Sequence, residues 1–211
     1  MINEQVEIET LNWDKVNGLI PAVIQDASTL QVLMLGYMNQ EALQKSIETG
    51  KVTFYSRTKK RLWTKGETSG NDLTLVSMIP DCDNDTLLVL VKPSGLSCHL
   101  NNRSCFGKND APGLGMLAKL EAIIDRRYQD RPMDSYVAKL FDEGIRRIAQ
   151  KVGEEAVEVV LASVGGSKID IINEAADLLF HLLILLRERH VNLIDVASAL
   201  NKRAQNHGVT S

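Results

Sequence analysis

The chain carries the stretch Asp81-Cys82-Asp83-Asn84-Asp85, followed downstream by Cys98-His99 and Cys105. All 3 cysteines of the protein fall within these segments. In an extended strand alternate side chains share a face, so the three aspartates are expected on one face and Cys82 on the other. Three carboxylates suit a hard ion such as Mg²⁺, and three thiolates suit Zn²⁺. The bland alternative is a solvated acidic turn with small, buried cysteines. The confinement of every cysteine to this window argues against it.

Length and composition bound the remaining possibilities. The chain has 211 residues, 44% hydrophobic and 24% charged, which fits one large or two small globular domains. Its net charge of −3 gives no indication of nucleic-acid binding or of a basic membrane contact.

Targeting signals and cysteine use indicate the compartment. The first residues are acidic and lack the basic and apolar regions of a signal peptide. The longest apolar run, Leu178 to Leu186, is interrupted by His181 and is too short to span a bilayer. An odd number of cysteines without a secretion signal favours a reducing compartment. We therefore expect a cytoplasmic protein without disulfides.

The first half of the chain reads as strands with few helices. A helix is expected from Asn39 to Thr49, with Asn39 as N-cap and Gly50 at its end. Apolar runs typical of strands lie on both sides of it, and the last is continuous enough to indicate burial on both faces: 32–35, 52–56, 73–79 and 86–91.

A Gly- and Pro-rich segment at 108–115 then changes the character of the chain. Beyond it, apolar residues recur at helical spacing over 116–127, 135–164, 168–189 and 192–206, and Gly165-Gly166 ends the second segment. We predict two domains: residues 1–107, α+β with mostly antiparallel strands, and residues 116–211, an all-α helical bundle.

The thiolate set indicates catalytic rather than structural zinc. Three protein ligands leave one position open for water, whose pKa zinc lowers to about 7. His99 has three possible roles: acid/base or substrate contact, a fourth ligand, or a structural hydrogen bond. We favour the first, because on a strand His99 would point away from Cys98.

A run of cations precedes a polar turn in the same half. Arg57, Lys59, Lys60, Arg61 and Lys65 stand just before the turn 66–71, which contains Thr68, Ser69 and Asn71. Such a run is often only a solvated face. Glycines with hydroxyl and amide groups beside cations also hold phosphate. Beside a zinc site, this pattern suggests a phosphorylated substrate.

Three segments resemble phosphoribosyl-AMP cyclohydrolase of histidine biosynthesis: Trp63-Thr-Lys-Gly-Glu-Thr-Ser-Gly-Asn71, Asp81-Cys-Asp-x-Asp85 and Cys98-His-x5-Cys105. The resemblance covers nearly all of 10–107. It implies hydrolytic opening of an adenine ring between N1 and C6, and an intertwined dimer whose zinc site takes cysteines from both subunits. It also implies the following metal ligands: Zn²⁺ on Cys82, Cys98 and Cys105, and Mg²⁺ on Asp81, Asp83 and Asp85. The cationic and polar segment is expected, from its own residues, to contact the substrate.

The second half carries paired carboxylates at helical spacing. Glu155 and Glu158 share a helix face, and Glu174 and Asp177 repeat the spacing on the next helix. Carboxylates beside so apolar a stripe are costly unless they are paired or hold a metal. Two antiparallel helices would gather the four around Mg²⁺. Ordinary surface glutamates are the alternative. Glu154 lies to one side, and His181 is expected to be a satisfied core histidine.

Charge alone suggests a Mg²⁺ site for a polyphosphate, where a glutamate deprotonates the attacking water. Arg146, Arg147 and Lys151 are candidate anion contacts. The carboxylate pattern is similar to the all-α pyrophosphohydrolases of the MazG type. Ser135-Tyr-Val-Ala-Lys-Leu140 and Gly144-Ile-Arg-Arg-Ile-Ala-Gln-Lys151 narrow the resemblance to phosphoribosyl-ATP pyrophosphohydrolase.

Together the two resemblances predict a bifunctional hydrolase of histidine biosynthesis that acts on phosphoribosyl-adenine nucleotides, at least as a dimer, with no nucleic-acid or membrane partner. Two alternatives remain open. The helical half could be a general nucleoside triphosphate pyrophosphohydrolase, or the chain could be a structural zinc domain joined to a helical dimerisation module.

Overall fold

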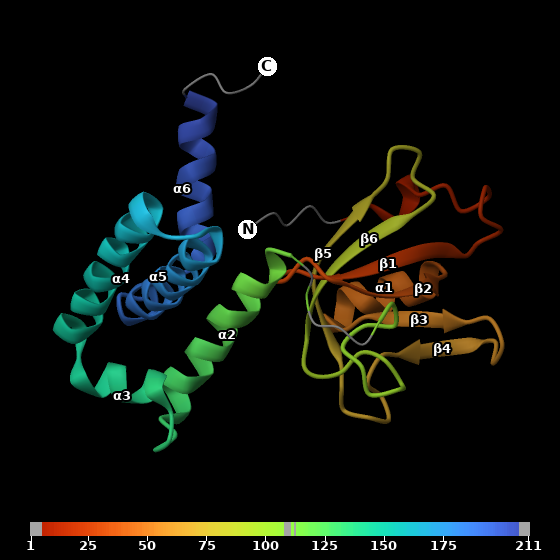
Figure 1. Ribbon diagram of the computed structural model, residues 1–211. Helices are drawn as coiled ribbons and strands as arrows, with labels where there is room; N and C mark the ends of the chain where they lie inside the picture. Colours follow the sequence, from red (N-terminus) through yellow and green to blue (C-terminus); the bar gives the residue numbers. More distant parts are fainter. Residues whose placement is uncertain (1–5, 108–110, 112, 207–211) are drawn as a thin grey trace. The chain divides into compact units, whose positions relative to one another are not determined.

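The computed structural model describes residues 6–107, 111 and 113–206 (Figure 1). The chain divides into two compact units, Met1–Met116 and Leu117–Ser211. The predicted linker 108–115 lies partly outside the described residues. The predicted domain bounds, 1–107 and 116–211, stay a prediction.

The first unit is built on a four-stranded sheet in the order β2-β1-β6-β5. Its strands are β1 (Ile20–Asp26), β2 (Val32–Met38), β5 (Leu73–Pro80) and β6 (Leu87–Pro93). Neighbours pair antiparallel except β1 and β6, which pair in parallel. The predicted strand-rich, mostly antiparallel first half is therefore confirmed. The chain has to cross from β2 to β5 before β6 returns beside β1.

The segment between β2 and β5 forms helix α1 and a small hairpin. Helix α1 (Gln40–Thr49) is where the sequence predicts it, because the Asn39 side chain accepts from the Ala42 amide at 2.9 Å and Gly50 adopts a left-handed φ of 66°. Strands β3 (Thr53–Ser56) and β4 (Arg61–Thr64) pair antiparallel. A short 3₁₀ helix, η1 (Ile8–Thr10), lies near the start.

The core of the first unit lies between the sheet, α1 and the small hairpin. Strand β1 alternates buried and half-buried positions, as a strand with one covered face does. Strand β6 alternates in the same way, so the predicted burial of this strand on both faces is wrong. Gly36 of β2 lies where a Cβ atom would come within 2.3 Å of the Phe54 ring, so this close packing requires glycine.

The second unit is all-α, as predicted, and comprises α2 (Gly115–Asp130), α3 (Tyr136–Glu143), α4 (Ile145–Gly165), α5 (Lys168–Glu188) and α6 (Leu193–Asn206). Helices α4 and α5 run side by side (Figure 1). The single predicted helical segment 135–164 is wrong in one respect. Gly144, at a φ of 84°, interrupts it and separates α3 from α4.

Helix α5 begins with a capping box, in which Ser167 and Asp170 satisfy each other's backbone amides. The core of the helical unit contains residues of α2, α3, α4 and α5, among them Ile124, Phe141, Ile148 and Ile184. Across the described part of the chain, no helix is long and apolar enough to cross a membrane.

Candidate active sites

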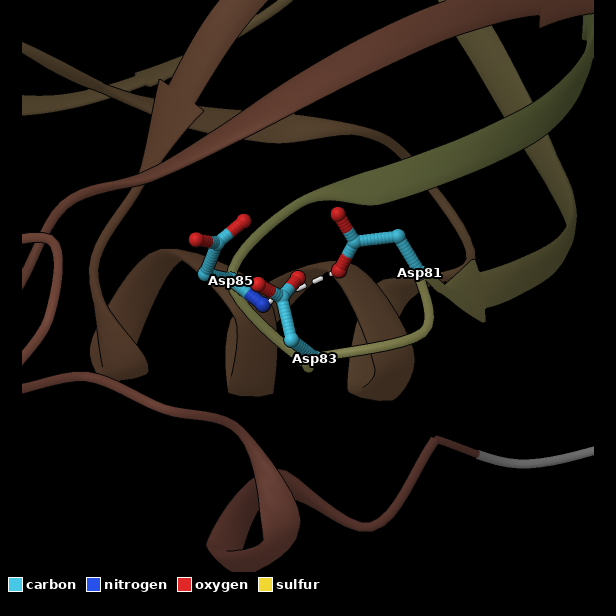
Figure 2. A group of neighbouring side chains, drawn as sticks. All are labelled: Asp81, Asp83 and Asp85. Atoms are coloured by element: carbon cyan, nitrogen blue, oxygen red, sulfur yellow. Dashed lines mark hydrogen bonds between the residues drawn. The ribbon is translucent and has the colours of Figure 1, made fainter.

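The three aspartates of the first unit gather on the turn that joins β5 to β6. Asp81, Asp83 and Asp85 each offer a carboxylate oxygen, and these oxygens lie within 4.8 Å of one another (Figure 2). The turn is tight because the Asp81 carboxylate accepts from the amides of Asp85 at 3.0 Å and Thr86 at 3.1 Å. Hard oxygen ligands at this spacing fit a Mg²⁺ ion.

The three aspartates were predicted to group on one face of an extended strand, and this explanation is wrong. Residues 81–85 form a turn rather than a strand, and Asn84 takes a left-handed φ of 60°. The carboxylates converge because the chain reverses direction, not because alternate residues share a face.

A lysine from a distant segment also reaches this turn. The Lys15 ammonium forms ion pairs with Asp83 and Asp85. The hydrogen bond from Lys15, together with one from the Thr86 hydroxyl, holds the pKa of Asp85 below its usual range. The same carboxylates raise the pKa of Lys15, so it carries its charge throughout the neutral range.

Two of the three cysteines lie together on the loop after β6. The pKa of the Cys105 thiol is raised mainly by its partial burial and further by the neighbouring Cys98 thiol. The positive charge of Lys65 lowers this pKa by a smaller amount. The loop is attached to β2, because the Cys105 amide donates to the Leu33 carbonyl at 2.7 Å and the Ser104 hydroxyl donates to the Val32 carbonyl at 2.7 Å. A thiol pair fixed by a strand is suited to holding Zn²⁺.

Cys82 lies on the aspartate turn and is exposed. Among the described residues it does not join Cys98 and Cys105 in a group of metal ligands. His99 is exposed on a turn, not on a strand, so the strand-based reason for its orientation is wrong. In one copy of the chain, therefore, two thiols gather and the third stands apart.

The predicted substrate contacts have varied surroundings. Arg57 stacks on the Tyr37 ring, 3.7 Å from its centroid. Lys65 is buried beside Trp63, 5.9 Å from the ring centroid. Thr68 and Ser69 are exposed. The backbone N–H of Asn71 donates to the Ser69 hydroxyl at 3.3 Å.

A cavity of about 270 Å³ lies beside these groups and is lined by Ser56, Lys59, Arg61, Trp63, Glu67 and Thr68. Arg61 pairs with Glu67 at 2.8 Å and lowers the pKa of that carboxyl. The charge of Arg61 is therefore already balanced by Glu67. Lys59 is the other positively charged residue that lines this cavity.

The carboxylates of the second unit gather between α4 and α5. Glu155, Glu158 and Glu174 each place an oxygen within 4.8 Å of the other two. Burial raises the pKa of Glu174, and a hydrogen bond with Glu158 and the charges of Glu158, Asp177 and Glu155 raise it further. Asp177 stands outside the group of three but close enough to act on Glu174. Such crowding of like charges is relieved by a cation.

Of the three basic residues predicted to contact an anion here, Lys151 and Arg147 form ion pairs within the protein, and Arg146 is exposed. Lys151 contacts Glu155 at 2.7 Å and Glu154 at 3.0 Å, and both carboxylates raise its pKa. Arg147 pairs with Glu143 and Glu154. Arg146 is exposed on α4. Glu154 therefore belongs to an ion-pair network beside the cluster.

His181 is buried, as expected of a core histidine, and both ring nitrogens have partners. The Asp177 backbone carbonyl can only accept, so Nδ1 donates to it at 2.9 Å. In the neutral ring the other nitrogen is an acceptor, so Nε2 accepts from the Tyr136 hydroxyl at 3.0 Å. Nδ1 also lies 3.6 Å from a Glu155 oxygen. The sequence did not point to the contact between Tyr136 and His181 or to Lys15, because these partners are 45 and 68 residues apart.

Comparison with known families divides the chain as the fold does. The family Phosphoribosyl-AMP cyclohydrolase matches residues 34–107. The family Phosphoribosyl-ATP pyrophosphohydrolase matches residues 117–204. Each carboxylate cluster therefore lies within the segment matched by one family.

Curated relatives contain both segments in one chain. A protein of Photobacterium profundum named "Histidine biosynthesis bifunctional protein HisIE" is 53% identical over 93% of this chain and 97% of its own length. Proteins of the same name from Salmonella typhimurium and Escherichia coli are each 53% identical over 97% of this chain and their full length.

Proposed function

Because the chain belongs to the family of bifunctional HisIE proteins of histidine biosynthesis, we propose how its two units divide the chemistry. The helical unit releases pyrophosphate from phosphoribosyl-ATP, and the strand-rich unit hydrolyses the adenine ring of the phosphoribosyl-AMP so formed. The product of the second unit is thus the substrate of the first. One observation supports this assignment above all. Each unit has a group of three carboxylates that could hold a metal ion, and each group lies within the segment that one of the two families matches.

In the helical unit we assign Mg²⁺ to Glu155, Glu158, Glu174 and Asp177. Burial, the hydrogen bond with Glu158 and the charges of the neighbouring carboxylates together raise the pKa of Glu174. The repulsion among these carboxylates supports the assignment, since a divalent cation would remove it. Bound Mg²⁺ would neutralise charge on the polyphosphate. A glutamate of the cluster, Glu155 or Glu158, would accept the proton of the attacking water. Lys151 and Arg146 would contact phosphate.

In the strand-rich unit we assign Mg²⁺ to Asp81, Asp83 and Asp85, and Zn²⁺ to Cys82, Cys98 and Cys105. The proximity of Cys98 and Cys105 supports the zinc assignment. Zinc would supply an activated water at neutral pH, since it lowers the pKa of bound water to about 7. His99 would transfer protons to and from the ring nitrogen. The substrate would be held by Arg57, Lys65, Thr68, Ser69 and Asn71.

We also propose that the active form is at least a dimer, with Cys82 of one copy completing the thiol pair of another. The separation of Cys82 from Cys98 and Cys105 within one copy supports this. Apolar side chains left exposed on α4 and α5 add support, because a large exposed apolar surface is costly in water: Val157, Val160, Leu161, Val164 and Ile172. We also propose a cytoplasmic location, which the membership in histidine biosynthesis supports.

Two single substitutions test the division of labour. With phosphoribosyl-ATP, Mg²⁺ and trace Zn²⁺, the unaltered protein releases pyrophosphate first and ring-opened product after a lag. Cys105→Ser keeps pyrophosphate release and accumulates phosphoribosyl-AMP. Glu155→Gln lowers pyrophosphate release by about 100-fold or more but still opens the ring of added phosphoribosyl-AMP.

The alternatives predict other results. A general pyrophosphohydrolase would hydrolyse ordinary nucleoside triphosphates in preference to phosphoribosyl-ATP. A purely structural zinc site would make Cys105→Ser unfold the strand-rich unit, which circular dichroism and a thermal melt would detect. A folded Cys105→Ser protein with full ring-opening activity would contradict the zinc assignment.

A further inference from the structure

Lys15 places a permanent positive charge on the aspartate turn. Its ammonium contacts Asp83 and Asp85, two of the three carboxylates proposed to bind Mg²⁺. Lys15 belongs to neither strand of that hairpin and lies 68 residues before Asp83. The turn therefore already has a cation supplied by the protein itself.

The backbone around Lys15 is attached to the same turn. The backbone N–H of Asn12 donates to the backbone carbonyl of Asn84 at 2.7 Å. The side-chain oxygen of Asn12 accepts from the backbone N–H of Lys15 at 3.3 Å. These bonds hold the base of a long, flexible side chain next to the carboxylates. The fold therefore keeps the Lys15 ammonium within reach of the turn.

An ammonium and a divalent cation compete for these oxygens. Mg²⁺ requires oxygen ligands at about 2.1 Å, and an ammonium on the same oxygens would lie close enough to repel it. We propose that Lys15 is a built-in counter-cation that Mg²⁺ must displace from Asp83 and Asp85. Lys15 then has two effects: it neutralises the turn without metal, and it weakens Mg²⁺ binding.

This inference rests on the proposed Mg²⁺ site, and a calorimetric titration of the zinc-loaded, full-length protein with Mg²⁺ tests both. Glu158→Gln and Glu174→Gln are present in every sample to silence the helical cluster. In this background Lys15→Met binds Mg²⁺ about fivefold more tightly, the factor expected from removing two ion pairs that water still reaches. Lys15→Arg keeps the charge and the original affinity.

Lys92→Met is the matched control. Lys92 is an exposed lysine of β6 with no ion pair recorded in the described part of the chain, so removing its charge leaves Mg²⁺ affinity unchanged. A thermal melt gives a second readout. Lys15→Met lowers the melting temperature of the metal-free protein, whose carboxylates then repel each other, and saturating Mg²⁺ restores it.

Each outcome decides the matter. Tighter binding by Lys15→Met alone supports the counter-cation role. Unchanged or weaker binding by Lys15→Met overturns it and leaves the Mg²⁺ site standing. If none of the variants binds Mg²⁺, or if Asp83→Asn binds it as well as the unaltered turn, the proposed site and the role of Lys15 both fall.

Discussion

Glu158 and Glu174 share a hydrogen bond on facing helices, although both are acids that repel each other when ionised. The proposed metal sites of both units are built from carboxylates gathered in this way. Lys15 and Lys151 show the complementary arrangement, since each places its ammonium on two carboxylates. At the scale of the residue, both sites therefore combine crowded acids with one nearby lysine.

The crowding at Glu174 leads to a prediction about metal dependence. Glu174→Gln removes one of the repelling charges, so the metal-free helical unit melts at a higher temperature than the unaltered protein. The same change removes a ligand, so added Mg²⁺ no longer raises the melting temperature of the helical unit, while any Mg²⁺ effect on the strand-rich unit remains. Glu188→Gln, at the end of α5, serves as the control and alters neither result. A Mg²⁺-dependent stabilisation that survives in Glu174→Gln would exclude Glu174 as a ligand.

At the scale of the element, local signals place most helices and strands correctly. Asn39 and Gly50 bound α1, and Gly165 ends α4. Strands β1 and β4 were not predicted from the sequence. Strand β4 lies within the cation run, and its place follows from pairing with β3 rather than from its own composition. The break at Gly144 was not predicted either; its φ of 84° is one that no other residue type adopts easily.

The capping box of α5 leads to a pH-dependent prediction. Hydrogen bonds from Ser167 hold the pKa of Asp170 below its ordinary value of 3.8. The folded state thus binds fewer protons than the unfolded state, and the stability that Asp170 contributes is present above pH 3.8 and is lost as the pH falls through the lowered pKa. Urea denaturation should show that Asp170→Asn destabilises the helical unit at neutral pH, with a difference that shrinks in acid.

Two comparisons complete this test. Ser167→Ala removes the other half of the box and costs about 1 kcal/mol at neutral pH. Asp130→Asn, an exposed position at the end of α2, has no effect at any pH. A constant difference between Asp170→Asn and the unaltered protein down to strongly acidic pH would rule out this contribution.

At the scale of the whole molecule, two units of different class carry two consecutive hydrolyses in one chain. The helical unit leaves Leu161 and Val164 of α4 largely exposed, on the same helix as two glutamates of the carboxylate cluster. We propose that a second copy covers this surface.

The proposed assembly leads to a prediction about size and activity. In zinc-free protein, where no thiol site can join two copies, Leu161→Arg places a charge on the apolar surface of α4 and lowers the mass measured by light scattering to that of one chain. Pyrophosphate release falls in parallel if the second copy supports the helical site. Asp130→Arg, the same new residue on an exposed polar position, keeps the original mass. A Leu161→Arg protein of unchanged mass would move the interface elsewhere.

The amino-acid sequence by itself determined the two fold classes, the bounds of α1, and the residue types that make both sites, because these depend on local periodicity, capping residues and ligand chemistry. Only the tertiary structure decided that residues 81–85 form a turn, that Lys15 occupies it, that Cys82 stands apart from Cys98 and Cys105, and that Tyr136 meets His181. The contacts of Lys15 and of Tyr136 join segments far apart in the chain. They exist only because β1 pairs with β6 and because α3, α4 and α5 pack on one core.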